Sequence, residues 1–246
     1  MYRLLSLAVL AGLALTSCAP AYIANTRNVP MFAEANEFAG SVALSSGVDV
    51  QAAYSVSDHV AVMANANTVQ QTLNPGDNKP SFKRNHFFAE GGLGYFSRTK
   101  KSRFELFGGY GMGSGTSYES YFFFHTQSQS VVTKGTYSRI FIQPSIGTNN
   151  KKFNLMFTAR VSFVNFTKFS TEDPAATPME YKPTDGYQVV IEPAITARIH
   201  LAGNVRGFFQ LGINRALNED VLFNVVPVQG SIGIQIHTGQ LSTRVY

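Results

Sequence analysis

The chain has little of what soluble globular proteins usually carry. Its 246 residues include one cysteine and no tryptophan, and only 14% of them are charged. A single cysteine excludes a disulfide within the chain, so hydrogen bonding and packing must hold the fold together. The charged fraction is low for a surface that faces water on every side. We therefore expect something other than water to cover part of this surface.

No motif of a common metal or nucleotide site is present. The five histidines lie far apart, and neither HExxH nor Cys-x-x-Cys spacing occurs, so no metal and no cofactor is predicted. The glycine-rich stretch 108–115 matches neither GxGxxG nor a P-loop. The absence of G-x-S-x-G excludes a serine hydrolase of the α/β type. The net charge of +5 comes from scattered cations, which excludes nucleic acid as an expected partner.

The apolar run Leu4–Leu15 is too short to cross a bilayer as a helix. It follows Met1-Tyr2-Arg3, and a charged start before a short apolar core is typical of a secretory signal. The next residues, Leu15-Thr16-Ser17-Cys18, resemble the lipobox of bacterial lipoproteins, in which the cysteine is acylated and becomes the new N-terminus. This resemblance implies a signal peptide over 1–17 and a lipid on Cys18.

What the rest of the chain does have is alternation of apolar and polar residues. In Phe153–Phe163 the odd positions are apolar and the even ones, except Met156, are polar or charged. The pattern returns in 187–201, 205–214 and 228–237, and it is typical of strands with two different faces. Each of the first two runs is long enough to cross a bilayer as a tilted strand, which takes about 9–11 residues.

These patterns predict an antiparallel up-and-down transmembrane β-barrel over 37–246, with ten strands and eight as the alternative. The six earlier strands are expected at 38–44, 48–56, 59–69, 84–97, 102–114 and 136–147. Closure is required because an open sheet edge in hydrocarbon would leave backbone groups unpaired. Pro144 and Pro193 fall inside expected strands, where each implies a bulge or an edge. A tethered periplasmic β domain therefore stays open.

The expected connections alternate in length. Short turns at 57–59, 98–102, 148–151 and 202–204 alternate with longer segments at 70–83, 115–135, 170–184 and 215–224. In outer-membrane barrels the short turns are periplasmic, and an even strand number puts both ends of the barrel there. This predicts an outer-membrane protein with a periplasmic N-terminus, in which residues 18–36 tether the lipid on Cys18 to the first strand.

Acidic and basic residues share the face opposite the apolar one. In a barrel of this size that face is mostly filled by side chains, and charges there must be paired. We therefore predict a lumen charge network, with Asp49 as a further member, and leave open a narrow pore lined by its arginines. The network consists of Glu90, Glu105, Glu192, Arg103, Arg139, Arg160, Arg198 and Arg206.

Enzymes built on such barrels assemble Asp, His and Ser from loops and leave little local pattern. The candidates are His125 with Ser128 or Ser130, and Asp173 or Asp185. A general base needs a partner within about 3 Å, and no spacing in the chain places one there. No catalytic residue is therefore predicted, and a hydrolase or acyltransferase acting on lipid A or peptides is kept as an alternative.

A family resemblance runs over residues 18–65. The segments Tyr22–Phe32, Glu37-Phe38, Val50–Tyr54 and Asp58–Asn65 resemble a group of uncharacterised outer-membrane barrel proteins of Bacteroidota, many of which carry a lipobox. The resemblance implies the same fold and compartment and transfers no catalytic residues. Ala19-Pro20-Ala21 lacks the acidic run that resembles a surface-export signal in that phylum, which favours a periplasm-facing anchor.

The function expected from the sequence is therefore a structural or binding role in a lipid-anchored outer-membrane barrel, without enzymatic activity. Its expected partners are outer-membrane lipids. The loop 115–135, rich in Tyr, Phe, Ser and Gln, is the expected contact for an external ligand or protein, because binding residues concentrate on loops.

Overall fold

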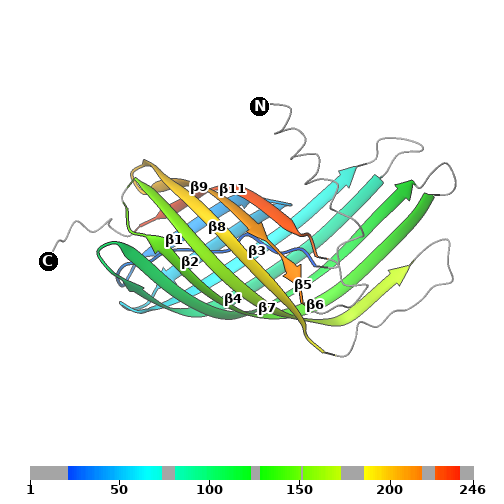
Figure 1. Ribbon diagram of the computed structural model, residues 1–246, viewed down its shortest axis with the longest axis horizontal. Helices are drawn as coiled ribbons and strands as arrows, with labels where there is room; N and C mark the ends of the chain where they lie inside the picture. The colour runs from blue at the N-terminus through cyan, green and yellow to red at the C-terminus, as the bar shows by residue number, and fades with distance from the viewer. Residues whose placement is uncertain are drawn as a thin grey trace.

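The computed structural model describes residues 22–73, 81–122, 128–150, 152–172, 186–217 and 225–238. They form one antiparallel sheet that closes into a barrel (Figure 1). Among these residues, no helix is long and apolar enough to cross a membrane. The strands are β1 (Phe38–Leu44), β2 (Val48–Ser55), β3 (Val60–Leu73), β4 (Ser81–Arg98), β5 (Ser102–Phe122), β6 (Ser128–Thr148), β7 (Phe153–Glu172), β8 (Gln188–Ala202), β9 (Val205–Ile213), β10 (Arg215–Ala216) and β11 (Val228–His237).

The barrel wall consists of ten strands when β9 and β10 are counted as one, which confirms the predicted strand number. The two-residue strand β10 continues β9 beyond Asn214, and both pair with β8. On the other side β9 pairs with β11, which in turn pairs with β1 and so closes the ring. The neighbours of β2 to β8 along the sheet follow the chain order. Closure gives every long strand two hydrogen-bonded neighbours and leaves no sheet edge.

The two faces of the strands separate as the alternation predicts. In β8 the outward residues Ile191, Ile195 and Ile199 are 36–53% exposed, whereas the inward Glu192 and Thr196 are at most 2% exposed. The same holds around the ring, where most exposed large side chains are apolar. A surface of this kind is stable against hydrocarbon and unfavourable in water.

The two rims of the barrel differ. The short-turn rim carries the connections 56–59, 99–101, 149–152 and 203–204, together with the start of β1 and the end of β11. We call the opposite rim, where β1, β3, β5 and β7 end and β2, β4, β6, β8 and β11 begin, the long-loop rim, because most of its connections are longer in sequence. Strands β3 to β7 project beyond the other strands at this rim (Figure 1).

This projection corrects the prediction of a loop over 115–135. Residues 115–122 belong to β5 and 128–135 to β6, and they pair with each other from Gly115–Gly135 to Phe122–Ser128. The sequence pattern misses these strand ends because both of their faces lie above the apolar band, so the alternation of apolar and polar residues stops there. The backbone ladder, which needs no alternation, continues.

The two prolines sit inside the closed barrel and not at an edge. Pro193 of β8 lies opposite Ala159 of β7, and Pro144 pairs with Leu106 of β5. The pairing of β6 with β7 is interrupted between Ile142 and Ser145, which brackets Pro144. The ladder thus omits the hydrogen bonds that proline cannot donate, and no strand ends there.

Candidate functional site

The described residues that precede β1 run through the inside of the barrel. Tyr22 forms a parallel bridge with Val225, at the long-loop rim. At the other end, the backbone N–H of Asn36 donates to the carbonyl of Ser55, at the short-turn rim. Residues 22–33, which lie between these two points, are all buried. We call residues 22–33 the lumen segment.

Side chains of the barrel wall satisfy the backbone of the lumen segment. Gln210 accepts from the N–H of Arg27 at 2.8 Å and donates to its carbonyl at 3.0 Å. Three further glutamines, Gln51, Gln143 and Gln229, donate to the carbonyls of Thr26, Asn28 and Ala24 at 2.6–2.8 Å. A buried backbone outside any sheet needs such partners, because unpaired N–H and C=O groups are costly away from water.

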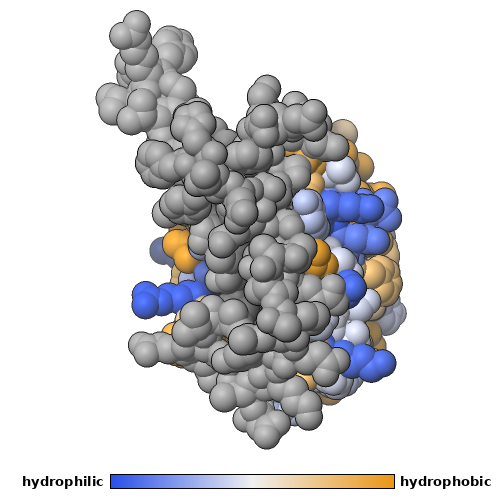
Figure 2. All heavy atoms as spheres, turned by 90° about the vertical axis from the view of Figure 1, so that its right-hand side faces the viewer, coloured by the Kyte–Doolittle hydropathy of each residue, from blue (hydrophilic) through white to orange (hydrophobic). Residues whose placement is uncertain are grey.

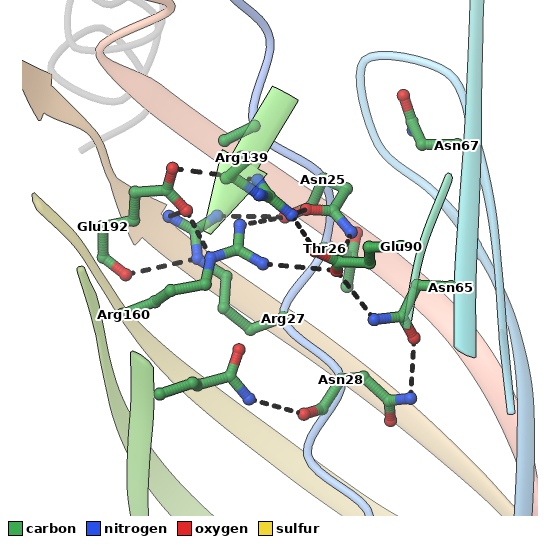
Figure 3. Close-up of polar contacts among 12 residues, drawn as sticks. Asn25, Thr26, Arg27, Asn28, Asn65, Asn67, Glu90, Arg139, Arg160 and Glu192 are labelled. Atoms are coloured by element: carbon green, nitrogen blue, oxygen red, sulfur yellow. Dashed lines mark hydrogen bonds and ion pairs between the residues drawn. The ribbon is translucent and has the colours of Figure 1, made fainter. Parts of the chain in front are cut away.

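A charge cluster lies midway along the lumen segment (Figure 3). Arg139 of β6 forms an ion pair with Glu90 of β4, and Arg160 of β7 forms one with Glu192 of β8. Arg27 of the lumen segment lies 4.0 Å from the Glu192 carboxylate. All five side chains are 0% exposed. Buried charges persist only when paired and hydrogen-bonded, and here each carboxylate is shared by at least two arginines.

Two neutral residues of the lumen segment complete this cluster. The Tyr22 hydroxyl donates to Glu192 at 2.6 Å and accepts from Arg139. The Asn25 amide donates to Glu90 at 2.9 Å, and its oxygen accepts from Arg139 at 2.9 Å. The lumen segment therefore contacts both acidic residues of this cluster and cannot leave without breaking its hydrogen bonds to them.

A second group of charges lies toward the short-turn rim. Glu105 accepts from the N–H of Phe32 at 3.0 Å. Arg103 donates to the carbonyl of Met31, and Arg198 donates to the carbonyls of Val29 and Pro30. Arg206 is buried and faces the charges of Arg103 and Glu37. Glu105, Arg103 and Arg198 thus bind the part of the lumen segment that lies nearest the short-turn rim.

Apolar clusters lie at both ends of the polar centre. Toward the long-loop rim, Tyr22 packs with Phe88 and Tyr137, and its ring lies 5.5 Å from that of Tyr137. Toward the short-turn rim, Phe32 packs against Phe96, Phe107 and Phe141. A cavity beside Arg27 in the polar centre measures about 10 Å³, at most the space of one water molecule.

The structure brings the predicted lumen residues together, but in pairings that the sequence does not indicate. All eight are buried inside the barrel, and so is Asp49, which accepts from Thr26 at 2.9 Å. The enzyme candidates His125, Asp173 and Asp185 lie outside the described residues, as does Cys18. Ser128 and Ser130 lie in β6. Within the described part of the chain, no three His, Cys, Asp or Glu side chains gather as a metal site.

The lumen segment is the part of the site that sequence reasoning missed. Residues 22–33, expected only to join an anchor to the first strand, instead fill the barrel. One signal in the sequence pointed to it. The family resemblance includes Tyr22–Phe32, whereas a segment that only spans a distance would need no specific sequence. Its polar residues Asn25, Thr26, Arg27 and Asn28 have no strand periodicity, since their partners come from all around the ring.

Comparison with known proteins gives likeness in fold alone. No family model and no curated protein matches the chain. Among solved structures, the translocator domain of the autotransporter NalP from Neisseria meningitidis is 11% identical with a TM-score of 0.46, covering 82% of this chain and 86% of that one. CarO of Acinetobacter baumannii is 10% identical with a TM-score of 0.37, covering 86% and 99%. OmpT, an outer membrane protein of Vibrio cholerae, is 8% identical with a TM-score of 0.24, covering 82% and 95%.

Proposed function

We propose that this protein is an outer-membrane barrel of structural or binding role that is closed by its own N-terminal segment. The observation that carries the proposal is the lumen segment, buried from Tyr22 to Ala33 and bound to the wall through Glu90 and Glu192. The apolar outer face supports insertion into a bilayer, because a transmembrane barrel needs an outward apolar band about 25 Å tall. A structural or binding role of this kind requires no catalytic activity.

The filled lumen argues against the narrow pore. A water path past the arginines would need continuous space, whereas Arg27, Arg139 and Arg160 are engaged by carboxylates and by the lumen segment. The aromatic clusters around Tyr22 and Phe32 add an apolar barrier on either side. We therefore propose a barrel that does not conduct ions at rest.

Conductance in planar bilayers tests this proposal. The purified full-length protein is expected to insert and to show no single-channel steps. Steady ion conductance of the wild type would overturn the closed-barrel function. Heat-modifiable gel mobility of the same preparation checks that the barrel is folded, so silence cannot come from unfolded protein.

The direction of the lumen segment bears on the lipid anchor. The sequence favours a periplasmic anchor at Cys18, but Tyr22 lies at the long-loop rim. Four residues reach about 14 Å at most, so Cys18 cannot return through the lumen to the opposite rim. Since longer loops are extracellular in outer-membrane barrels, we propose that an acylated Cys18 anchors in the outer leaflet.

Metabolic labelling with an alkyne palmitate analogue tests the acylation itself. The wild type is expected to incorporate the label and Cys18→Ala to lose it, while both proteins stay in the outer membrane because the barrel inserts without the lipid. Label retained by Cys18→Ala would contradict the anchor. Release of Cys18→Ala as a soluble protein would contradict the membrane-inserted barrel and favour the tethered periplasmic domain.

A further inference from the structure

The outer face of the projecting strands carries a groove that the closed-barrel function does not use. It has a volume of about 650 Å³, within the range of small-ligand sites. Its lining comes from four neighbouring strands, β4 to β7, and includes two lysines, an exposed phenylalanine and several hydroxyl groups. Seen from the end to which these strands project, hydrophilic side chains stand at the flank of the molecule beside hydrophobic ones (Figure 2).

The strand register places the groove directly above the apolar band. Gly91, Tyr110, Ile140 and Phe163 form one row across β4 to β7, and Tyr110 and Ile140 are 51% and 43% exposed. Four residues further toward the long-loop rim, or five along the bulged β7, the rows become mostly polar. They read Phe87, Ser114, Thr136 and Lys168, and then Asn85, Thr116, Lys134 and Ser170. This change marks the level at which a bilayer passes from hydrocarbon to headgroups.

The floor of the groove is made by small residues. At Gly115 an added Cβ would meet the His86 ring at 2.0 Å, and at Gly135 it would meet the Phe166 ring at 3.1 Å, so both positions turn their missing side chains inward. Only their backbone faces the groove. Because the side chains of Lys134, Lys168 and Phe87 are larger than those of their row neighbours, they form its walls.

The chemistry of the two polar rows fits a phosphate at a membrane surface. Lys134 and Lys168 lie on adjacent strands, displaced by one outward position, because Lys134 is opposite Ser170 and Thr136 is opposite Lys168. Diagonal neighbours of this kind are about 7–8 Å apart, so that both ammonium groups can reach one anion. The eight residues of these rows include no acidic side chain, and the next row toward the rim holds one acid and one further lysine, Glu172 and Lys83. The hydroxyls of Thr116 and Thr136 add donors beside the lysines.

From this arrangement we propose that the groove binds the phosphorylated headgroup of a membrane lipid, with Lys168 and Lys134 on the phosphate and Phe87 on the upper part of the acyl chains. Lysines at this level of a bilayer keep their stems in the apolar region and place the ammonium among the headgroups. Attraction to anionic lipids there acts through each cation near the surface. The proposal rests on the proposed membrane insertion of the barrel.

Native mass spectrometry of the full-length protein in a non-ionic detergent tests this site, with bis-phosphorylated lipid A as the probe. Lys134→Ala/Lys168→Ala is expected to bind it at least tenfold more weakly than the wild type. The control is Lys100→Ala/Lys152→Ala, which removes the same charge from exposed positions at the short-turn rim and is expected to bind like the wild type. Equal loss in both double variants, or in neither, would overturn the proposal.

Two further binding measurements use the wild-type protein alone. Lipid A with its phosphates removed is expected to bind the wild type at least tenfold more weakly, and equal binding would overturn the phosphate site. Inorganic phosphate in millimolar excess is expected not to displace lipid A, whereas full displacement would assign the groove to free phosphate. Heat-modifiable mobility separates the two proposals, because a protein that never inserts contradicts the barrel function, and an inserted barrel without lipid discrimination contradicts only this site.

Discussion

Glu90 and Arg139 form a buried ion pair across an intervening strand. Glu90 is on β4 and Arg139 on β6, and the residue of β5 that pairs with both is Gly111. An added Cβ at Gly111 would lie 2.7 Å from the Glu90 Cβ and 2.4 Å from the Phe88 ring. The missing side chain of one strand therefore makes the space in which its two neighbours meet.

Gly111→Ala is expected to destabilise the barrel by about 1–3 kcal/mol, the usual effect of overpacking a core. The added methyl group would displace Phe88 and the Glu90 carboxylate, and the carbonyl of Ala89 at 2.9 Å cannot move out of the ladder. Chemical unfolding in detergent measures the change. Gly230→Ala is the matched control, because nothing lies within 4 Å of its added Cβ. Equal stability of the two variants would contradict the packing argument.

Glu192→Gln is expected to lower the free energy of unfolding by about 3–5 kcal/mol, because breaking a buried ion pair leaves an uncompensated charge. Arg160 would lose the nearer of its two carboxylates, and Arg27 and Arg139 would lose the carboxylate 4.0 Å away. Glu34→Gln removes a charge from a partly exposed position and is expected to change little. The same unfolding measurement compares them, and similar stability would show that the cluster contributes no more than a surface charge.

Thiol reactivity reports whether the lumen segment stays in place. In a Cys18→Ser background, Thr26→Cys is expected to react with a maleimide at least a hundredfold more slowly than Thr99→Cys. Thr26 is 0% exposed, whereas Thr99 lies in an exposed short turn. Comparable rates in the folded barrel would mean that the segment leaves the lumen readily, and the closed-barrel function would then fail.

The direction of the lumen segment predicts which end of the chain is outside. An epitope inserted between Ala21 and Tyr22 is expected to bind antibody on intact cells, because Tyr22 lies at the long-loop rim. The same epitope after Tyr246 is expected to bind only after permeabilisation, because β11 ends with His237 at the short-turn rim. The reverse pattern of antibody binding would show that the barrel has the opposite orientation in the membrane, with its N-terminus in the periplasm.

Local pattern determined much of the barrel. The alternation in Phe153–Phe163 and 187–201 predicted strands β7 and β8 and the face that each residue takes, because a strand repeats every two residues whatever its partners are. It also placed Glu90, Glu192, Arg139 and Arg160 on the inner face. These are properties of single strands, so a single strand's sequence contains them.

The contents of the lumen were decided only by the tertiary structure. Tyr22 meets Glu192 across 170 positions of the chain, and Arg27 meets Gln210 across 183. No local spacing relates such residues, since their distance depends on how ten strands close around a segment without strand periodicity. The projecting ends of β5 and β6 were missed for a related reason. Above the apolar band both faces of a strand meet polar surroundings, so the backbone ladder continues where the sequence pattern stops.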